Sequence, residues 1–142
     1  MTDSHDTGAA AGAAADANKA LLRAFYDAVR RGDARAAMDL LADDVVFHQP
    51  GRNPTSGDYR GKEAAVSLPR LLADRSGGTF RFEVHDVAAT HDHAIGLLRI
   101  SGRRDGRSID MPAAHVFHIR DGKLAELWIH PLDQHEIDEF WA

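Results

Sequence analysis

Two polar side chains in this sequence, His115 and Gln49, lie in strand-like segments where they could carry chemistry. The segment 108–119 alternates so that His115 shares one face with Met111, Ala113, Phe117 and Ile119. Burial among apolar groups lowers the pKa of a histidine and favours a neutral imidazole, which can accept a proton. Gln49 can donate hydrogen bonds but has no accessible protonation equilibrium. The pair predicts a pocket with His115 as the candidate base and Gln49 beside it, or else a structural histidine bonded to a backbone carbonyl or bridging a dimer.

Tyrosine, arginine and histidine side chains elsewhere could bind a ligand beside this pair. Tyr26 or Tyr59 could donate a hydrogen bond to a developing oxyanion. Arg52 lies with Tyr59 in the Gly- and Pro-rich segment 50–61, which either rims a pocket or is an ordered connection. His48 points away from the pocket unless the bend at the following proline turns it inward. All four residues are candidate ligand contacts.

The last strand-like segment, 123–130, has two alternative orientations. Counting from the Asp-Gly turn that precedes it puts Leu127 and Ile129 on the pocket side. A one-residue bulge would bring Trp128 and His130 there instead. Trp128 and His130 are therefore further candidates for ligand binding.

Histidine is frequent, with nine residues in the chain, so metal binding has to be considered. His91 and His93 flank Asp92 in a turn, but turn residues with this spacing are more often simply solvated. His118 points to the opposite face of its strand from His115, so these two histidines cannot bind one ion. We therefore expect no metal site and no cofactor.

Helix and strand patterns that must position these residues follow one another along the chain. An apolar stripe predicts a helix from Asn18, Gly32 can end it in the left-handed conformation, and Asp33 can cap a second helix. The β-branched and aromatic run 45–48 predicts the first strand, which Pro50-Gly51 ends. The segment 62–74 predicts a third helix, which Pro69 should kink or split. The later elements are strands over 79–89, 93–102, 108–119 and 123–130, with Asp-Gly turns at the last two joints, and a short helix over 133–141.

Composition indicates a globular protein with an N-terminal tail. The 142 residues suit one domain over residues 18–142, preceded by an Ala- and Gly-rich tail, residues 1–17, that lacks large apolar side chains and is expected to be disordered. The net charge of −5 gives no positive field to attract nucleic acid or anionic lipid. There is no cysteine, no apolar run that could span a membrane and no secretion leader, so we expect a cytoplasmic protein.

The segment 111–119 is mostly apolar on both of its faces. A solvated antiparallel sheet would carry polar residues on one face, so both faces of this strand should contact something apolar. Helices and a pocket can cover one face, and a second subunit can cover the other. We therefore expect a homodimer that binds a small hydrophobic molecule.

Several motifs together resemble one known superfamily. They are the Gly32-Asp33 corner, Leu-Ala-Asp-Asp before the first strand, the Gly-x-x-x-Gly-x-Glu-Ala pattern over 57–64, and the hairpin Asp121-Gly122-Lys123-Leu124. Their order and spacing over residues 18–142 resemble the NTF2-like superfamily, and within it the SnoaL-like group. The resemblance implies a cone-shaped α+β fold, in which a curved mixed or antiparallel sheet packs on three N-terminal helices and encloses a pocket. It also implies dimerisation through the outer face of the sheet.

Ketosteroid isomerases belong to this superfamily, and the resemblance allows their catalytic positions to be compared with this sequence. Phe25 stands in the place of their oxyanion-hole tyrosine, Gln49 in the place of their general base, and His115 in the place of their protonated aspartate. With all three groups replaced, the ketosteroid isomerase mechanism is not expected. The resemblance instead implies a cofactor-independent cyclase, isomerase, dehydratase or hydrolase acting on a hydrophobic carbonyl- or epoxide-bearing compound. The alternative is a non-catalytic ligand-binding or dimerisation domain.

Overall fold

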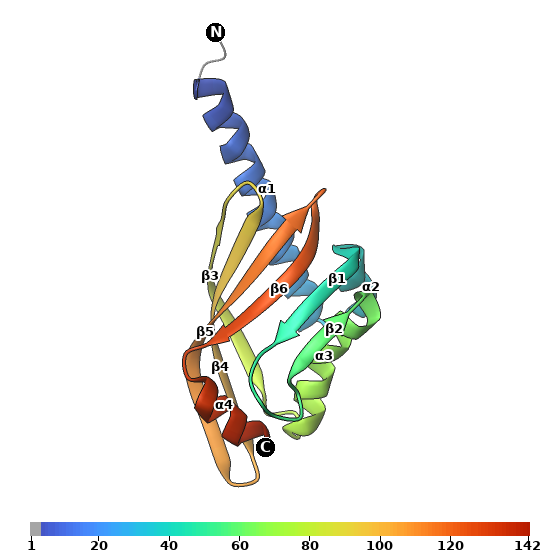
Figure 1. Ribbon diagram of the computed structural model, residues 1–142, viewed down its shortest axis with the longest axis vertical. Helices are drawn as coiled ribbons and strands as arrows, with labels where there is room; N and C mark the ends of the chain where they lie inside the picture. Colours follow the sequence, from blue (N-terminus) through green and yellow to red (C-terminus); the bar gives the residue numbers. More distant parts are fainter. Residues whose placement is uncertain (1–3) are drawn as a thin grey trace.

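A mixed six-stranded sheet and four helices make up residues 4–142, the part of the chain that the computed structural model describes (Figure 1). The helices are α1 (Ser4–Arg30), α2 (Ala34–Asp39), α3 (Lys62–Arg75) and α4 (Gln134–Trp141). The strands are β1 (Leu41–Gln49), β2 (Gly57–Arg60), β3 (Arg81–Ala89), β4 (His93–Arg104), β5 (Arg107–Arg120) and β6 (Lys123–Pro131). This arrangement confirms the predicted α+β fold.

The sheet has the strand order β2-β1-β6-β5-β4-β3. Only β1 and β6 run parallel, and the strands from β3 to β6 form the predicted antiparallel meander. Asp105-Gly106 and Asp121-Gly122 have positive φ at all four positions, as tight hairpin turns require. The sequence prediction missed β2, a four-residue edge strand that pairs with β1 within the segment expected to be a loop.

Local signals at the helix ends match the predictions. Gly32 has a φ of +71°, and the Asp33 carboxylate accepts a hydrogen bond from the backbone N–H of Ala36 at the start of α2. Helix α3 instead continues through Pro69, which removes one backbone donor without ending the helix. α1 contacts β3 and β4, and α3 contacts β1 and β2, so these two helices lie along the inner face of the sheet.

Helix α1 begins well before the predicted position. The sequence suggested a disordered tail over residues 1–17, but the helix starts at Ser4 and projects beyond the sheet (Figure 1). Residues 1–3 of that predicted tail lie outside the described residues. Alanine has the highest intrinsic helix propensity, which accounts for the extension although residues 8–13 are exposed.

The core lies between the inner face of the sheet and the helices. Leu22, Val45, Phe117 and Leu124 are fully buried there. Helix α4 closes one end of the core with buried side chains from Ile137, Phe140 and Trp141. Within residues 4–142, no helix is both long and apolar enough to cross a membrane.

Candidate functional site

A cavity of about 900 Å³ lies between the inner face of the sheet and helices α1, α3 and α4. Its walls are mainly apolar and include Phe25, Phe47, Phe82, Ile100, Leu127 and Trp141. The rings of Phe25, Phe47 and Phe117 pack edge to face, with ring centres 5.8–6.1 Å apart. A space of this size accommodates an organic ligand of moderate size.

Tyr26 and His115 form a polar pair on the cavity wall. The Tyr26 hydroxyl oxygen lies 2.9 Å from Nδ1 of His115, within hydrogen-bond distance. Tyr26 comes from α1 and His115 from the inner face of β5, where residue alternation had placed it. The sequence comparison had drawn attention to Phe25, whereas the adjacent Tyr26 makes this contact.

Gly96 makes room for this pair. It lies in β4 directly opposite His115, and a Cβ atom at this position would come 2.8 Å from Cζ of Tyr26 and closer still to the hydroxyl oxygen. A glycine inside a strand is the usual sign of such a close approach. The sequence contained this signal, but it was not used to assign the site.

Burial controls the ionisation of both members of the pair. Desolvation, with a smaller contribution from the charge of His130, lowers the pKa of His115 to about 4. Desolvation also raises the pKa of the Tyr26 phenol well above its usual range. At neutral pH the pair therefore consists of a neutral imidazole and a neutral phenol.

Gln49 is the third polar residue of the predicted site and also lines the cavity. Its side chain is buried, and its Nε2 donates a hydrogen bond to Oγ1 of Thr55 at 3.3 Å. The Thr55 hydroxyl in turn donates to Oδ1 of Asn53 at 2.6 Å. These contacts fix the Gln49 amide at the end of β1. The structure thus brings Tyr26, Gln49 and His115 to one cavity.

Three other predicted ligand contacts lie outside the residues that line the cavity. His48 and Trp128 lie on the outer face of the sheet, where their rings stack with centres 5.9 Å apart, and His130 is exposed. The β5–β6 register shifts near the turn, and beyond that shift His115 pairs with Ile129. Leu127 and Ile129 accordingly face the cavity, which are the residues that the first alternative named. The count behind it was wrong, because an unbroken register from Arg120 and Lys123 would pair His115 with Trp128, and the shift is what brings Ile129 opposite His115.

The loop after β1 packs against α4 and does not line the cavity beyond Pro50. The backbone N–H of Arg52 and the side-chain amide of Asn53 both donate hydrogen bonds to Oδ1 of Asp138 at 2.9 Å. Tyr59 donates its hydroxyl proton to the carbonyl of Thr55 at 2.6 Å. The Arg52 backbone is therefore held by Asp138, an acceptor that sequence reasoning did not connect with this loop, and the Tyr59 hydroxyl is held by the loop itself.

The loop after β1 does not rim the cavity, and charged residues from α1 and β3 do so instead. The exposed charged members of the cavity lining are Arg23, Asp27, Arg30, Arg81 and Glu83. Arg30 forms an ion pair with Asp27 one helical turn away. The mouth of the cavity thus lies between α1 and β3. In α1 these charged residues border the apolar stripe of the helix, a position that sequence reasoning did not connect with a cavity.

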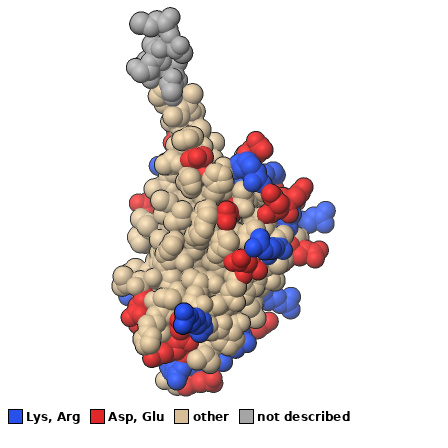
Figure 2. All heavy atoms as spheres, viewed as in Figure 1, with Lys and Arg blue, Asp and Glu red and all other residues tan. Residues whose placement is uncertain are grey.

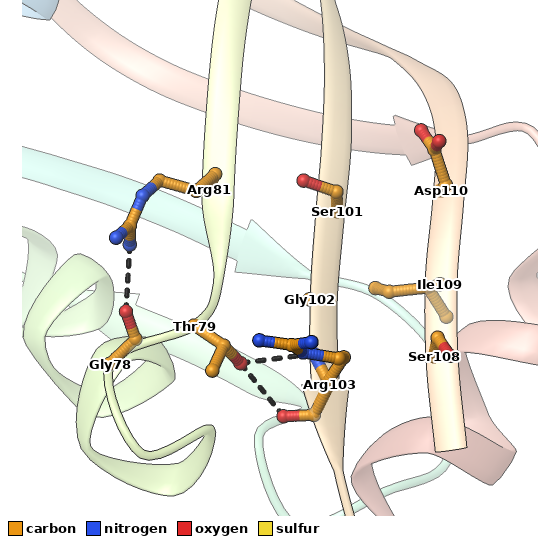
Figure 3. Close-up of a pocket in the computed structure, with 9 residues that line it drawn as sticks. All are labelled: Gly78, Thr79, Arg81, Ser101, Gly102, Arg103, Ser108, Ile109 and Asp110. Carbon is orange, nitrogen blue, oxygen red and sulfur yellow. Dashed lines mark hydrogen bonds between the residues drawn. The ribbon is translucent and has the colours of Figure 1, made fainter.

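A second, shallower hollow of about 370 Å³ lies where the segment before β3 meets β4 and β5 (Figure 3). Thr79 bridges to Arg103 there, since its hydroxyl donates to the Arg103 carbonyl at 2.7 Å and accepts from the Arg103 N–H at 2.9 Å. Figure 3 shows Arg81 directed toward the carbonyl of Gly78, to which it donates a hydrogen bond. None of the predicted site residues lines this hollow.

Solved structures share this fold across nearly the whole chain. Bal32a, from a soil-derived mobile gene cassette, is 29% identical with a TM-score of 0.84, and the match covers 91% of this chain and 99% of Bal32a. An NTF2-like protein from Burkholderia xenovorans LB400 is 17% identical with a TM-score of 0.78, covering 90% and 98% of the two chains. TerC, co-crystallised with polyporic acid, is 17% identical with a TM-score of 0.74, covering 87% and 97%.

Sequence comparison agrees with the structural similarity. No curated protein matches the chain. A family model for the SnoaL-like domain matches residues 22–127, which include strands β1 to β5, the first part of β6 and the Tyr26–His115 pair. The chain therefore belongs to the SnoaL-like domain family.

Proposed function

We propose that this protein is a small-molecule enzyme that acts, without a cofactor, on a hydrophobic compound bearing a carbonyl or epoxide group. The observation that carries the proposal is the Tyr26–His115 pair on the wall of a largely apolar cavity of about 900 Å³. Apolar walls supply affinity, and a few converging polar groups orient the ligand. TerC, which shares the fold, was co-crystallised with polyporic acid, in keeping with a small-molecule ligand.

The hydrogen bond between the two side chains allows His115 to act as the base while Tyr26 donates a hydrogen bond to the ligand. When His115 donates its Nδ1 proton to the Tyr26 oxygen, Nε2 carries a free lone pair and the phenol can donate to the ligand. Nε2 then accepts a proton from the carbon next to a carbonyl. The electron pair of the broken C–H bond moves to the carbonyl oxygen, where the Tyr26 O–H stabilises the enolate. Delivery of that proton to the enolate oxygen completes a keto–enol interconversion, and where a C=C bond is conjugated with the enolate, delivery to its far carbon completes a double-bond shift.

The low basicity of His115 restricts the substrate. Because burial lowers its pKa to about 4, the imidazole is a weak base and provides little driving force for removing a poorly acidic proton. A carbon between two carbonyl groups is activated enough for such a base. The same neutral pair could polarise an epoxide by hydrogen bonding. Activated dicarbonyl compounds and epoxides are therefore the substrate classes that the pair fits best.

Two probe reactions test the enzymatic proposal. Keto–enol interconversion of benzoylacetone, followed by absorbance, represents the dicarbonyl class, and hydrolysis of styrene oxide represents the epoxide class. We expect catalysis of at least one reaction, with a loss of about 100-fold or more in His115→Gln and a smaller loss in Tyr26→Phe. His85→Gln, an exposed histidine on β3, is the matched control. Undiminished turnover in His115→Gln would remove His115 from the mechanism.

A non-catalytic ligand-binding domain is the second candidate, and Gln49 is the observation that favours it. Relatives of the ketosteroid isomerase type use an acid at this position, whereas the Gln49 amide is buried and bonded to Thr55. Trp141 lines the cavity, so its fluorescence can report binding in a Trp128→Phe background that removes the other tryptophan. Quenching by benzoylacetone without turnover of either probe would support binding alone.

We also propose that two chains associate through the outer face of the sheet. Leu97 is 37% exposed on this face, and Ile95, Val116 and Trp128 are only partly buried there. Figure 2 shows charged side chains gathered toward the α2 and α3 side and the lower end of the molecule, with few over the central strands. Sedimentation should give a dimer that Leu97→Asp dissociates, while Leu132→Asp, at an exposed site outside the strands, leaves it intact. A monomeric wild-type protein at micromolar concentration would contradict this.

A further inference from the structure

Asp92, His93 and His118 come together on the outer face of the sheet. Each offers one ligand atom, and these atoms lie within 4.8 Å of one another. Asp92 lies in the β3–β4 turn, His93 begins β4, and His118 lies near the end of β5. This is the one such group of three potential metal ligands among the residues that the structure describes.

The sheet register places the two histidines side by side. His93 is the direct cross-strand partner of His118, and their ring centres are 5.0 Å apart. Directly opposed residues on adjacent antiparallel strands point to the same face. His115, three residues before His118, points to the other face and lines the cavity. The cluster is therefore separate from the proposed catalytic pair.

Hydrogen bonds within the turn hold the carboxylate next to the imidazoles. Nδ1 of His93 lies 2.9 Å from Oδ1 of Asp92. The Thr90 hydroxyl oxygen accepts a hydrogen bond from the His93 N–H at 3.0 Å, and the Ile119 N–H donates to the Asp92 carbonyl at 2.8 Å. The second of these bonds ties the turn to β5 immediately beyond His118. The three side chains are thus positioned by backbone contacts on both strands.

We propose that Asp92, His93 and His118 bind a divalent transition-metal ion, with Zn²⁺ as the best fit. Two imidazole nitrogens and one carboxylate oxygen form a three-residue set that Zn²⁺ commonly uses, leaving one tetrahedral position open. Ligand atoms around tetrahedral Zn²⁺ lie about 3.3 Å apart, so small side-chain rotations would close the present spacing. Nε2 of His91 lies 3.7 Å from Oδ2 of Asp92 and could supply the fourth ligand.

A metal ion at this site would stabilise the fold and would take no part in a reaction. The ion would join the β3–β4 turn to β5 and stabilise the native state, because the unfolded chain does not hold the three ligands together. This inference does not depend on the proposed enzymatic function.

Metal titration of the full-length protein tests the proposal. After treatment with EDTA and its removal, calorimetric titration with Zn²⁺ should show one ion per chain, and Co²⁺ should give the visible absorption of a tetrahedral complex. His118→Gln and Asp92→Asn should each weaken Zn²⁺ binding by about tenfold or more. His130→Gln, an exposed histidine on the same face of adjacent strand β6, is the matched control and should bind as the wild type does.

The variants also separate specific binding from loss of structure. Far-UV circular dichroism should be the same for all variants without metal, and Zn²⁺ should raise the Tm of the wild type and His130→Gln but not of His118→Gln. If His118→Gln does not fold, Asp92→Asn in the turn provides the same test. Equal Zn²⁺ affinity and stoichiometry in wild type, His118→Gln and Asp92→Asn would overturn the proposal. So would a wild-type protein that binds no Zn²⁺ at millimolar concentration.

Discussion

Gly96 and Tyr26 fit together so closely that any side chain at position 96 would overlap the phenol ring. A Cβ atom there would lie 2.8 Å from Cζ of Tyr26. The same phenol oxygen lies 2.9 Å from Nδ1 of His115. The glycine in β4 thus determines where the polar group from α1 can meet the histidine from β5.

Replacing Gly96 with alanine should displace Tyr26 and break its contact with His115. We expect a loss of about 1–3 kcal/mol in the free energy of unfolding, because an inserted methyl group in a packed site forces side-chain shifts. Urea unfolding provides the measurement. Gly12→Ala, in an exposed part of α1 with nothing within 4 Å of the added Cβ, is the control and should change the free energy of unfolding by no more than about 0.5 kcal/mol. An unchanged unfolding curve for Gly96→Ala would contradict the fit.

The stability of the protein should depend on pH through His115. Its pKa is about 4 in the folded state, below the ordinary value of 6.5, so the unfolded state binds more protons between these values. The free energy of unfolding should therefore decrease as the pH falls from 6.5 to about 4, by up to about 3 kcal/mol. Denaturation curves for wild type and His115→Gln across this range isolate the effect, because other titrating groups are common to both. If the free energy of unfolding changed equally with pH in both proteins, His115 would not be the cause.

The contribution of His48 to stability should depend on pH in the opposite sense to that of His115. Partial burial by itself lowers its pKa, but hydrogen bonds to Glu126 at 2.5 Å and Asp58 at 2.7 Å, with the charges of both, raise the pKa above 6.5. Its contribution to stability is fully present below pH 6.5 and is lost as the pH rises through the folded-state pKa. NMR titration should find His48 protonated to higher pH in the wild type than in Glu126→Gln. The same midpoint in both proteins would rule out this role for Glu126.

The first part of α1 should contribute little to stability. Residues 8–13 are exposed, whereas Asn18 is buried and its side-chain amide donates to the Thr90 carbonyl at 3.0 Å. We expect deletion of residues 2–12 to change the Tm by no more than about 2 °C, whereas Asn18→Ala should cost about 1 kcal/mol and lower the Tm by several degrees. Thermal unfolding followed by circular dichroism distinguishes the two. A large decrease on deletion would show that this segment stabilises the body of the protein.

Local chemistry explains why much of the fold could be predicted. Asp-Gly pairs define their own hairpin turns, and Asp33 can cap α2 whatever surrounds it. Alternation along β5 correctly placed His115 on the inner face, because side-chain direction within one strand depends only on parity. By contrast, β2 was missed because a short edge strand is stabilised by its pairing with β1 and carries little signal of its own.

The sequence by itself determined the order of the elements, the turns between them and the faces on which most side chains lie, since these depend on neighbours within a few residues. The tertiary structure decided which residues from different elements meet. Tyr26 contacts His115 beside Gly96, and His93 lies opposite His118 on the adjacent strand. The mouth of the cavity lies between α1 and β3 and not at the loop after β1. Such contacts depend on strand register and helix packing, which arise only when the whole chain buries its core.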